Sequence, residues 1–162
     1  MAQGKTVLLA VRIGEASVRA ARTAAWLGKA LGARVSVLYV AAELETVAVV
    51  AAGAGLDQAE VRKRIEAEAR DRADELVRDI LGDLPYDVVI AEGDVAEGVT
   101  DAAASMGADL IVVGSRGRSA VRSIILGDTA RDILRRAPCA VVVVPPGAAE
   151  HADAGESEEP QA

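Results

Sequence analysis

Three glycines follow an apolar segment in the last third of the chain: Gly114, two residues, Gly117, nine residues, Gly127. Glycine lets a backbone approach a ligand closely, and the amide groups that open a helix can hold a phosphate. The spacing therefore indicates a nucleotide-binding turn, although glycines in such turns are common and the pattern alone is weak evidence. Asp128 follows Gly127 and puts a carboxylate close to where the anion would lie.

Other nucleotide and catalytic motifs are absent from the sequence. Neither GxGxxG nor GxxxxGK[ST] occurs, which argues against a dinucleotide-binding Rossmann domain and a P-loop NTPase. Arg12 ends the first apolar segment, where a phospho-receiver would need acidic residues for its metal. No GxSxG elbow is present and the only histidine is His151, near the C-terminus, so Ser-His-Asp catalysis is excluded. We predict no catalytic residue and no metal site.

Five short apolar segments alternate with helical patterns. Strands are predicted at residues 6–11, 34–40, 86–91, 109–114 and 140–145. Helices are predicted at about 15–31, 57–80 and 95–106, and from the end of the glycine loop to about 136. Near-continuous apolar strands separated by helices are typical of a parallel sheet covered on both faces. Ligands of such sheets bind beyond the carboxyl ends of the strands, where the strand order reverses.

Two helix boundaries carry local signals. Asp57 with Glu60 resembles a capping box, and Gly32 and Gly107 are plausible helix stops. The apolar segment at 41–56 ends in small residues and glycines; a mobile lid over a ligand, a partner contact and a packed connection all remain open for it.

Charge separates the chain into two parts. The net charge of the chain is −7. Residues 147–162 hold five acidic residues and no Lys or Arg, so the net charge of residues 1–146 is −2. We expect a domain at 1–146 and an acidic disordered tail at 147–162. A nearly neutral domain does not favour nucleic acid or an anionic membrane as a partner.

The aromatic, apolar and cysteine content of the sequence limits the possible partners and the cellular compartment. There is no Phe, one Trp and two Tyr, so stacking platforms for single-stranded nucleic acid are nearly absent. No membrane-spanning segment and no signal-peptide pattern is found, and we expect a cytoplasmic protein. Cys139 is the only cysteine, at the start of an apolar strand, and a buried hydrophobic role is favoured over a reactive thiol.

The segment VVGSRGRSAVRSIILGDTARDILRRAPCAVVVVP resembles the C-terminal signature of the universal stress protein family, and the resemblance extends over residues 5–145. It implies an α/β fold like that of the adenine nucleotide alpha hydrolases: an open five-stranded parallel sheet of order 3-2-1-4-5 with helices on both faces. It also implies a homodimer, often formed through the last strand, here 140–145. Some members bind ATP or related adenine nucleotides, and others do not.

The resemblance also implies site residues. The glycine loop would surround ribose and phosphates, the end of the first strand would lie near adenosine, and the end of the second strand would contact adenine. The candidate nucleotide-binding residues are Ala10, Val11, Arg12, Val40, Ala41, Gly114, Ser115, Arg116, Gly117, Arg118, Gly127, Asp128 and Thr129.

Two of these residues depart from the family pattern: Asp128 replaces a Ser or Thr, and Arg12 replaces an acid. Like charges about 4 Å apart near a protein surface repel by about 4 kcal/mol, roughly a thousandfold in affinity if fully expressed. Magnesium, Arg116 or Arg118 could offset the Asp128 charge, and an N-cap role is the simpler alternative. For Arg12 three roles remain open: pairing with Asp128, binding an anionic group of a changed effector, and solvent exposure without a role.

We therefore expect a stress-response regulatory protein, not an enzyme, that binds ATP or AMP, with or without magnesium, at the loop after strand four. The alternative is a nucleotide-independent dimeric interaction module whose site is closed by Arg12 and Asp128. A third possibility is an adaptor for a transporter or kinase acting through 41–56.

Overall fold

The computed structural model describes residues 4–12, 14–42, 44–115 and 126–145. The elements in chain order are β1 (Thr6–Val11), α1 (Glu15–Leu31), β2 (Arg34–Ala41), α2 (Leu44–Gly53), α3 (Gln58–Leu81), β3 (Tyr86–Glu92), α4 (Val95–Met106), β4 (Leu110–Gly114), α5 (Asp128–Arg136) and β5 (Ala140–Val144). Each predicted strand is present, with ends that differ from the prediction by at most one residue. The predicted tail at 147–162 lies outside the described residues.

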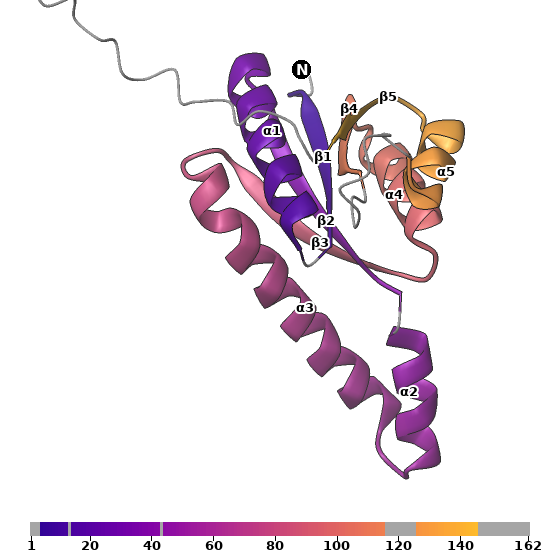
Figure 1. The fold of residues 1–162 in the computed structure, drawn as a ribbon. Helices are drawn as coiled ribbons and strands as arrows, with labels where there is room; N and C mark the ends of the chain where they lie inside the picture. Colours follow the sequence, from indigo (N-terminus) through magenta and orange to yellow (C-terminus); the bar gives the residue numbers. More distant parts are fainter. Residues whose placement is uncertain (1–3, 13, 43, 116–125, 146–162) are drawn as a thin grey trace, which may run out of the picture.

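The five strands form one parallel sheet in the order β3-β2-β1-β4-β5, which confirms the predicted architecture. Figure 1 shows α1 and α3 on one face of the sheet and α4 and α5 on the other. One core cluster packs the sheet against α1 and α3 around Leu9 and Val37, and a second packs the opposite face against α4 and α5 around Leu8 and Ile111. Neighbouring residues of β1 thus face opposite cores, which is why the strand is apolar throughout.

Helix boundaries follow the local signals in the sequence. The Asp57 side chain caps α3, accepting hydrogen bonds from the amides of Ala59 at 2.8 Å and Glu60 at 3.3 Å. Gly32 and Gly107 end α1 and α4 in the left-handed conformation, with φ of 59° and 61°. Only glycine adopts this conformation without a steric cost, so these residues stop the helices as predicted.

Helix α2 was not predicted. It lies within 41–56, the segment for which a lid and a packed connection were both open. Its buried residues, Leu44, Ala48 and Ala51, pack on one side, while Val49 and Val50 are 65% and 67% exposed. Because apolar residues lie on the exposed side as well as on the buried one, the segment lacks the apolar stripe by which an amphipathic helix is detected. Figure 1 shows α2 and the amino-terminal half of α3 extending beyond the sheet.

Within the described residues, no helix combines the length and the apolar character that crossing a membrane requires.

Candidate ligand site

The strand order reverses between β1 and β4, and the candidate residues of both strands meet there. The two strands are paired in parallel, with Ala10 opposite Val113. Gly114 comes directly after this pair on one strand, and Arg12 lies two residues beyond it on the other. The carboxyl edge at this reversal is where open parallel sheets bind ligands.

Gly114 has a packing role in addition to its place in the motif. A Cβ atom at this position would lie 2.6 Å from the backbone oxygen of Ala16 in the first turn of α1 and 3.1 Å from the Ala16 Cβ. A helix backbone cannot move aside as a flexible side chain can. Glycine is therefore required here by the contact between β4 and α1, whether or not a ligand binds.

Ser115 is likewise held within the protein. The residue is 2% exposed, and both its amide and its hydroxyl donate to the carbonyl oxygen of Val144, at 2.8 and 3.1 Å. Its hydroxyl therefore joins the end of β4 to the end of β5 in this arrangement and does not point to a ligand.

The predicted N-cap role of Asp128 is wrong. Gly127 is the N-cap of α5, Asp128 is the first helical residue, and no side chain accepts a capping hydrogen bond. The Asp128 side chain is 95% exposed and accepts a hydrogen bond from Arg131 at 3.3 Å. A carboxylate in the first turn still interacts favourably with the helix dipole, so Asp128 stabilises the start of α5 without capping it.

The predicted pairing of Arg12 with Asp128 is also absent: no ion pair joins the two among the described residues, and the partner of Asp128 is Arg131. Thr129 occupies the second position of α5. The remaining predicted loop residues, Arg116, Gly117 and Arg118, lie outside the described residues.

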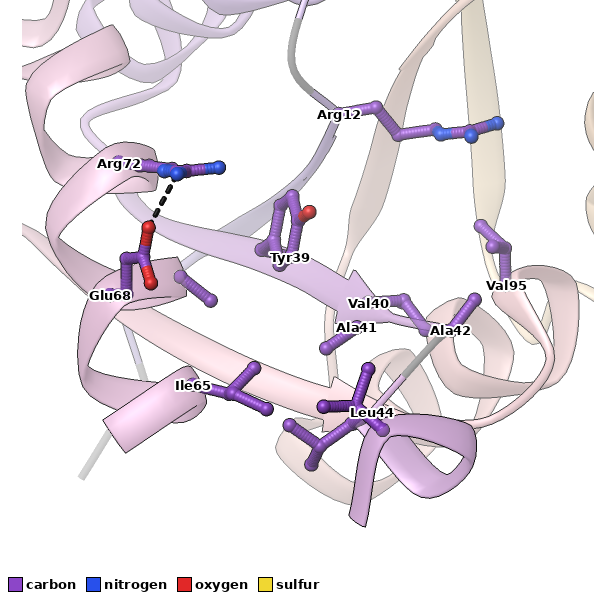
Figure 2. A pocket seen from close by; sticks show the side chains of 12 residues that line it. Arg12, Tyr39, Val40, Ala41, Ala42, Leu44, Ile65, Glu68, Arg72 and Val95 are labelled. Carbon is purple, nitrogen blue, oxygen red and sulfur yellow. Dashed lines mark hydrogen bonds and ion pairs between the residues drawn. The ribbon is translucent and has the colours of Figure 1, made fainter. Parts of the chain in front are cut away.

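A pocket with a volume of about 440 Å³ lies beyond the carboxyl end of β2. Its walls come from the ends of β1 and β2, from α2 and α3, and from the start of α4 (Figure 2). The lining residues are Arg12, Tyr39, Val40, Ala41, Ala42, Leu44, Val47, Ile65, Glu68, Ala69, Arg72 and Val95. Three of the predicted site residues, Arg12, Val40 and Ala41, are therefore brought together in one cavity.

Charge in this pocket is concentrated at two places. Arg72 and Glu68, one turn apart on α3, form an ion pair with each other. Arg12 is exposed, and its guanidinium makes no ion pair or hydrogen bond with another described residue, while its amide donates to the hydroxyl of buried Ser17 at 2.7 Å. Figure 2 shows the Arg12 side chain directed away from the Glu68–Arg72 pair.

Sequence reasoning missed the wall that α2 and α3 contribute, namely Leu44, Val47, Ile65, Glu68, Ala69 and Arg72. The sequence predicts the helix at 57–80, but nothing in it locates the amino-terminal half of that helix beside the end of β2. The available signal was the unusual apolar character of 41–56.

The described residues offer no other reactive centre. No group of three or more His, Cys, Asp or Glu side chains among them could hold a metal ion. Burial, and then the nearby Asp109 carboxylate, raise the pKa of the Cys139 thiol. Cys139 is only partly buried and packs against the second core cluster. The raised pKa agrees with the predicted lack of reactivity, since the thiolate is the nucleophile.

Comparisons with known proteins agree with the architecture. The family model for universal stress proteins matches residues 4–145. A universal stress protein from Thermus aquaticus, from the 3' region of a sulfhydrylase gene, is 31% identical over 140 residues, covering 86% of this chain and 98% of that protein. The universal stress protein UspA from Lactobacillus plantarum has a similar structure, with a TM-score of 0.66, 22% identity, and coverage of 89% of this chain and 99% of that chain.

Two further similar structures were solved with nucleotides. A universal stress protein from Archaeoglobus fulgidus in complex with dAMP has a TM-score of 0.59 at 21% identity, covering 89% of this chain and 99% of that chain. A universal stress protein in complex with cAMP has a TM-score of 0.56 at 20% identity, covering 88% of this chain and 97% of that chain. At these identities the structural likeness shows the fold.

Proposed function

Because the chain belongs to the universal stress protein family, we propose that it is a cytoplasmic regulatory protein that binds an adenine nucleotide at the carboxyl edge of its sheet. The pocket beyond β2 is the observation that carries this proposal. It adjoins the reversal between β1 and β4, most of its lining residues are apolar, and a cation, Arg12, reaches it from the end of β1. A base fits apolar walls, and a phosphate needs a cation nearby.

Two relatives with this fold were solved with cAMP and dAMP, which supports an adenine nucleotide as the ligand. The nucleotide is proposed as a regulatory ligand and not as a substrate. Glu68 is the one carboxylate among the described residues that line the pocket, and it is paired with Arg72. No described side chain there is poised as a general base or nucleophile.

A nucleotide-independent interaction module is the second candidate. Gly114, the first glycine of the motif, and Ser115, which follows it in the loop, have packing and hydrogen-bonding roles that require no ligand. The exposed Asp128 carboxylate at the start of α5 would also repel a phosphate. These observations would explain how the glycine spacing could persist in a protein that binds no nucleotide.

Calorimetric titration with AMP and ATP, each with and without magnesium, distinguishes the two functions. Micromolar binding of either nucleotide is expected under the proposal. Absence of heat at millimolar nucleotide, repeated at two temperatures to avoid an accidental zero enthalpy, would favour the interaction module. A magnesium requirement for ATP alone would indicate that the metal offsets the Asp128 charge.

A further inference from the structure

Arg12 is the cation of the pocket that is available to a ligand. The other arginine in the lining, Arg72, already has a carboxylate partner in Glu68. Arg12 is exposed, has no side-chain partner among the described residues, and has its backbone held by the buried Ser17 hydroxyl. A guanidinium anchored in this way offers several donors to an oxyanion at little cost in backbone order.

The surfaces around Arg12 suit an uncharged ring system. Val40 and Ala41 lie at the end of β2, each 8% exposed, and Leu44 and Ile65 form the wall beyond them. A nucleoside could place its base against these side chains and its 5' end toward Arg12. The pocket volume of about 440 Å³ lies near the lower end of the range for small-ligand sites.

The start of α5 carries the opposite charge. Asp128 is 95% exposed there, and its one described cationic partner, Arg131, lies 3.3 Å away and is itself 56% exposed. A chain of phosphates that extended from the pocket across the strand reversal to the amides of α5 would approach this carboxylate. Each added phosphate would increase the repulsion.

From these charges we propose that Arg12 binds the phosphate of a nucleoside monophosphate, and that the protein prefers a monophosphate to a triphosphate. This inference rests on the proposed function. It adds the number of phosphates on the preferred ligand and the residue that binds the phosphate. Arg12, which replaces the acid of the family pattern, is then a specificity-determining residue, and Asp128 opposes longer phosphate chains.

The test is calorimetric titration of the full chain with adenosine, AMP, ADP and ATP without magnesium. We expect AMP to bind about tenfold more tightly than adenosine, because one charge-assisted contact is gained, and ATP to bind more weakly than AMP. Arg12→Gln should lower AMP affinity about tenfold and leave adenosine affinity within about twofold. Arg12→Lys should retain part of the AMP preference because it keeps the charge.

Arg64→Gln is the matched control. It makes the same change in net charge on an exposed part of α3 that does not line the pocket. An equal loss of AMP affinity in Arg64→Gln and Arg12→Gln would overturn the assignment of Arg12, since the effect would then reflect net charge alone. Asp128→Ser should raise ATP affinity more than AMP affinity.

The outcomes separate this inference from the proposed function. Equal binding of adenosine and AMP, or tighter binding of ATP than of AMP, would contradict the inference while leaving nucleotide binding intact. No binding of any of the four compounds would contradict both. Far-UV circular dichroism of each variant shows whether a lost affinity reflects a lost fold.

Discussion

At the scale of single residues, a residue that occupies a position in the nucleotide motif does not have to contact a ligand. Gly114 matches the nucleotide motif and Ser115 follows it in the loop, yet the structure gives each a role inside the protein: Gly114 lets β4 contact α1, and Ser115 joins the end of β4 to the end of β5. Arg12 and Asp128 depart from the motif, and both have exposed side chains at the ligand edge. The departures therefore carry more information about this protein's ligand than the matches do.

Gly114→Ala is expected to destabilise the protein without any ligand present. The added Cβ would lie 2.6 Å from the Ala16 carbonyl oxygen, so β4 or α1 must shift, at a cost of about 1 to 3 kcal/mol. Urea unfolding of the ligand-free protein measures this. The control is Gly53→Ala at the end of α2, where the new Cβ has open space and no loss of that size is expected. Equal stability of Gly114→Ala and wild type would contradict the packing role.

At the scale of elements, a polar contact joins α3 to β3. The Tyr86 hydroxyl on β3 donates to Asp74 of α3 at 2.6 Å, and Arg78, one turn further along α3, pairs with the same carboxylate. The hydrogen bond from Tyr86, and then that from Arg78, lower the pKa of Asp74 from its ordinary value of 3.8. The ionised carboxylate is thus favoured in the folded state.

Because the pKa of Asp74 is lowered in the folded state, the stability of the fold depends on pH. A carboxylate with a lowered pKa stabilises the fold at pH above its unfolded value, and the contribution is lost as the pH falls through the folded value. Tyr86→Phe should therefore cost about 1 kcal/mol at pH 7 and less below about pH 4. Chemical denaturation at several pH values measures this. Tyr39→Phe is the matched control, because no described residue forms a hydrogen bond with the Tyr39 hydroxyl. A pH-independent loss in Tyr86→Phe would exclude the role of Asp74.

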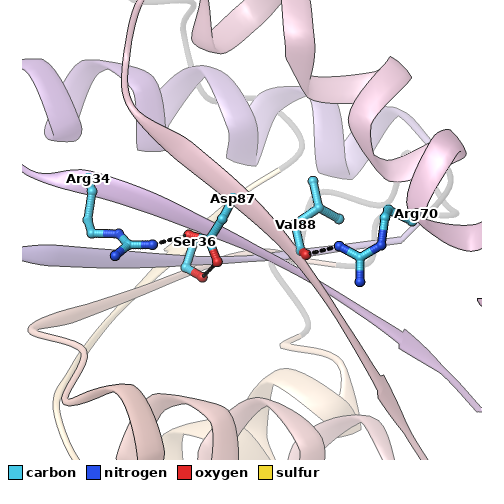
Figure 3. A network of polar contacts seen from close by, with 5 residues as sticks. All are labelled: Arg34, Ser36, Arg70, Asp87 and Val88. Carbon is cyan, nitrogen blue, oxygen red and sulfur yellow. Dashed lines mark hydrogen bonds and ion pairs between the residues drawn. The ribbon is translucent and has the colours of Figure 1, made fainter.

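At the scale of the whole molecule, the two edges of the sheet differ. The Val88 carbonyl of the edge strand β3 accepts a hydrogen bond from Arg70 of α3, and Asp87 on the same strand pairs with Arg34 and accepts from Ser36 (Figure 3). The opposite edge strand, β5, is AVVVV, without a charged side chain. Charged side chains hinder pairing of sheet edges, and apolar edges favour it.

From this asymmetry, and from the homodimer that the family resemblance implies, we propose that the protein forms a homodimer through β5. Sedimentation velocity should give the mass of a dimer, and Val142→Lys, which places a charge on the apolar edge strand, should weaken the dimer at least about tenfold. Val88→Lys makes the same change on β3 and should leave the dimer intact. If both variants remained dimeric with wild-type circular dichroism, the dimer would have to form through another surface.

The order of the five strands and of helices α1, α3, α4 and α5 was determined by the sequence alone, whereas α2 was missed. Near-continuous apolar segments such as 6–11 and 34–40 specify strands buried on both faces, and capping residues such as Asp57 and Gly32 set helix ends, because these are local effects of backbone hydrogen bonding and of sterics. The family resemblance then predicted the strand order 3-2-1-4-5, which the structure confirms.

Only the tertiary structure decided what surrounds the site. Three features could not be predicted from the spacing of residues in the sequence. They are the pocket wall made by Leu44 and Ile65, the contact of Gly114 with Ala16, and the pairing of Asp128 with Arg131 in place of Arg12. The wall and the Gly114 contact depend on how elements distant in sequence pack together. The ion pair of Asp128 with Arg131 depends on where α5 begins. Because the helix begins at Asp128 itself, this residue lies in the first turn and not at the N-cap. Periodicity and spacing record which face of an element is apolar, but not the neighbour that the face meets.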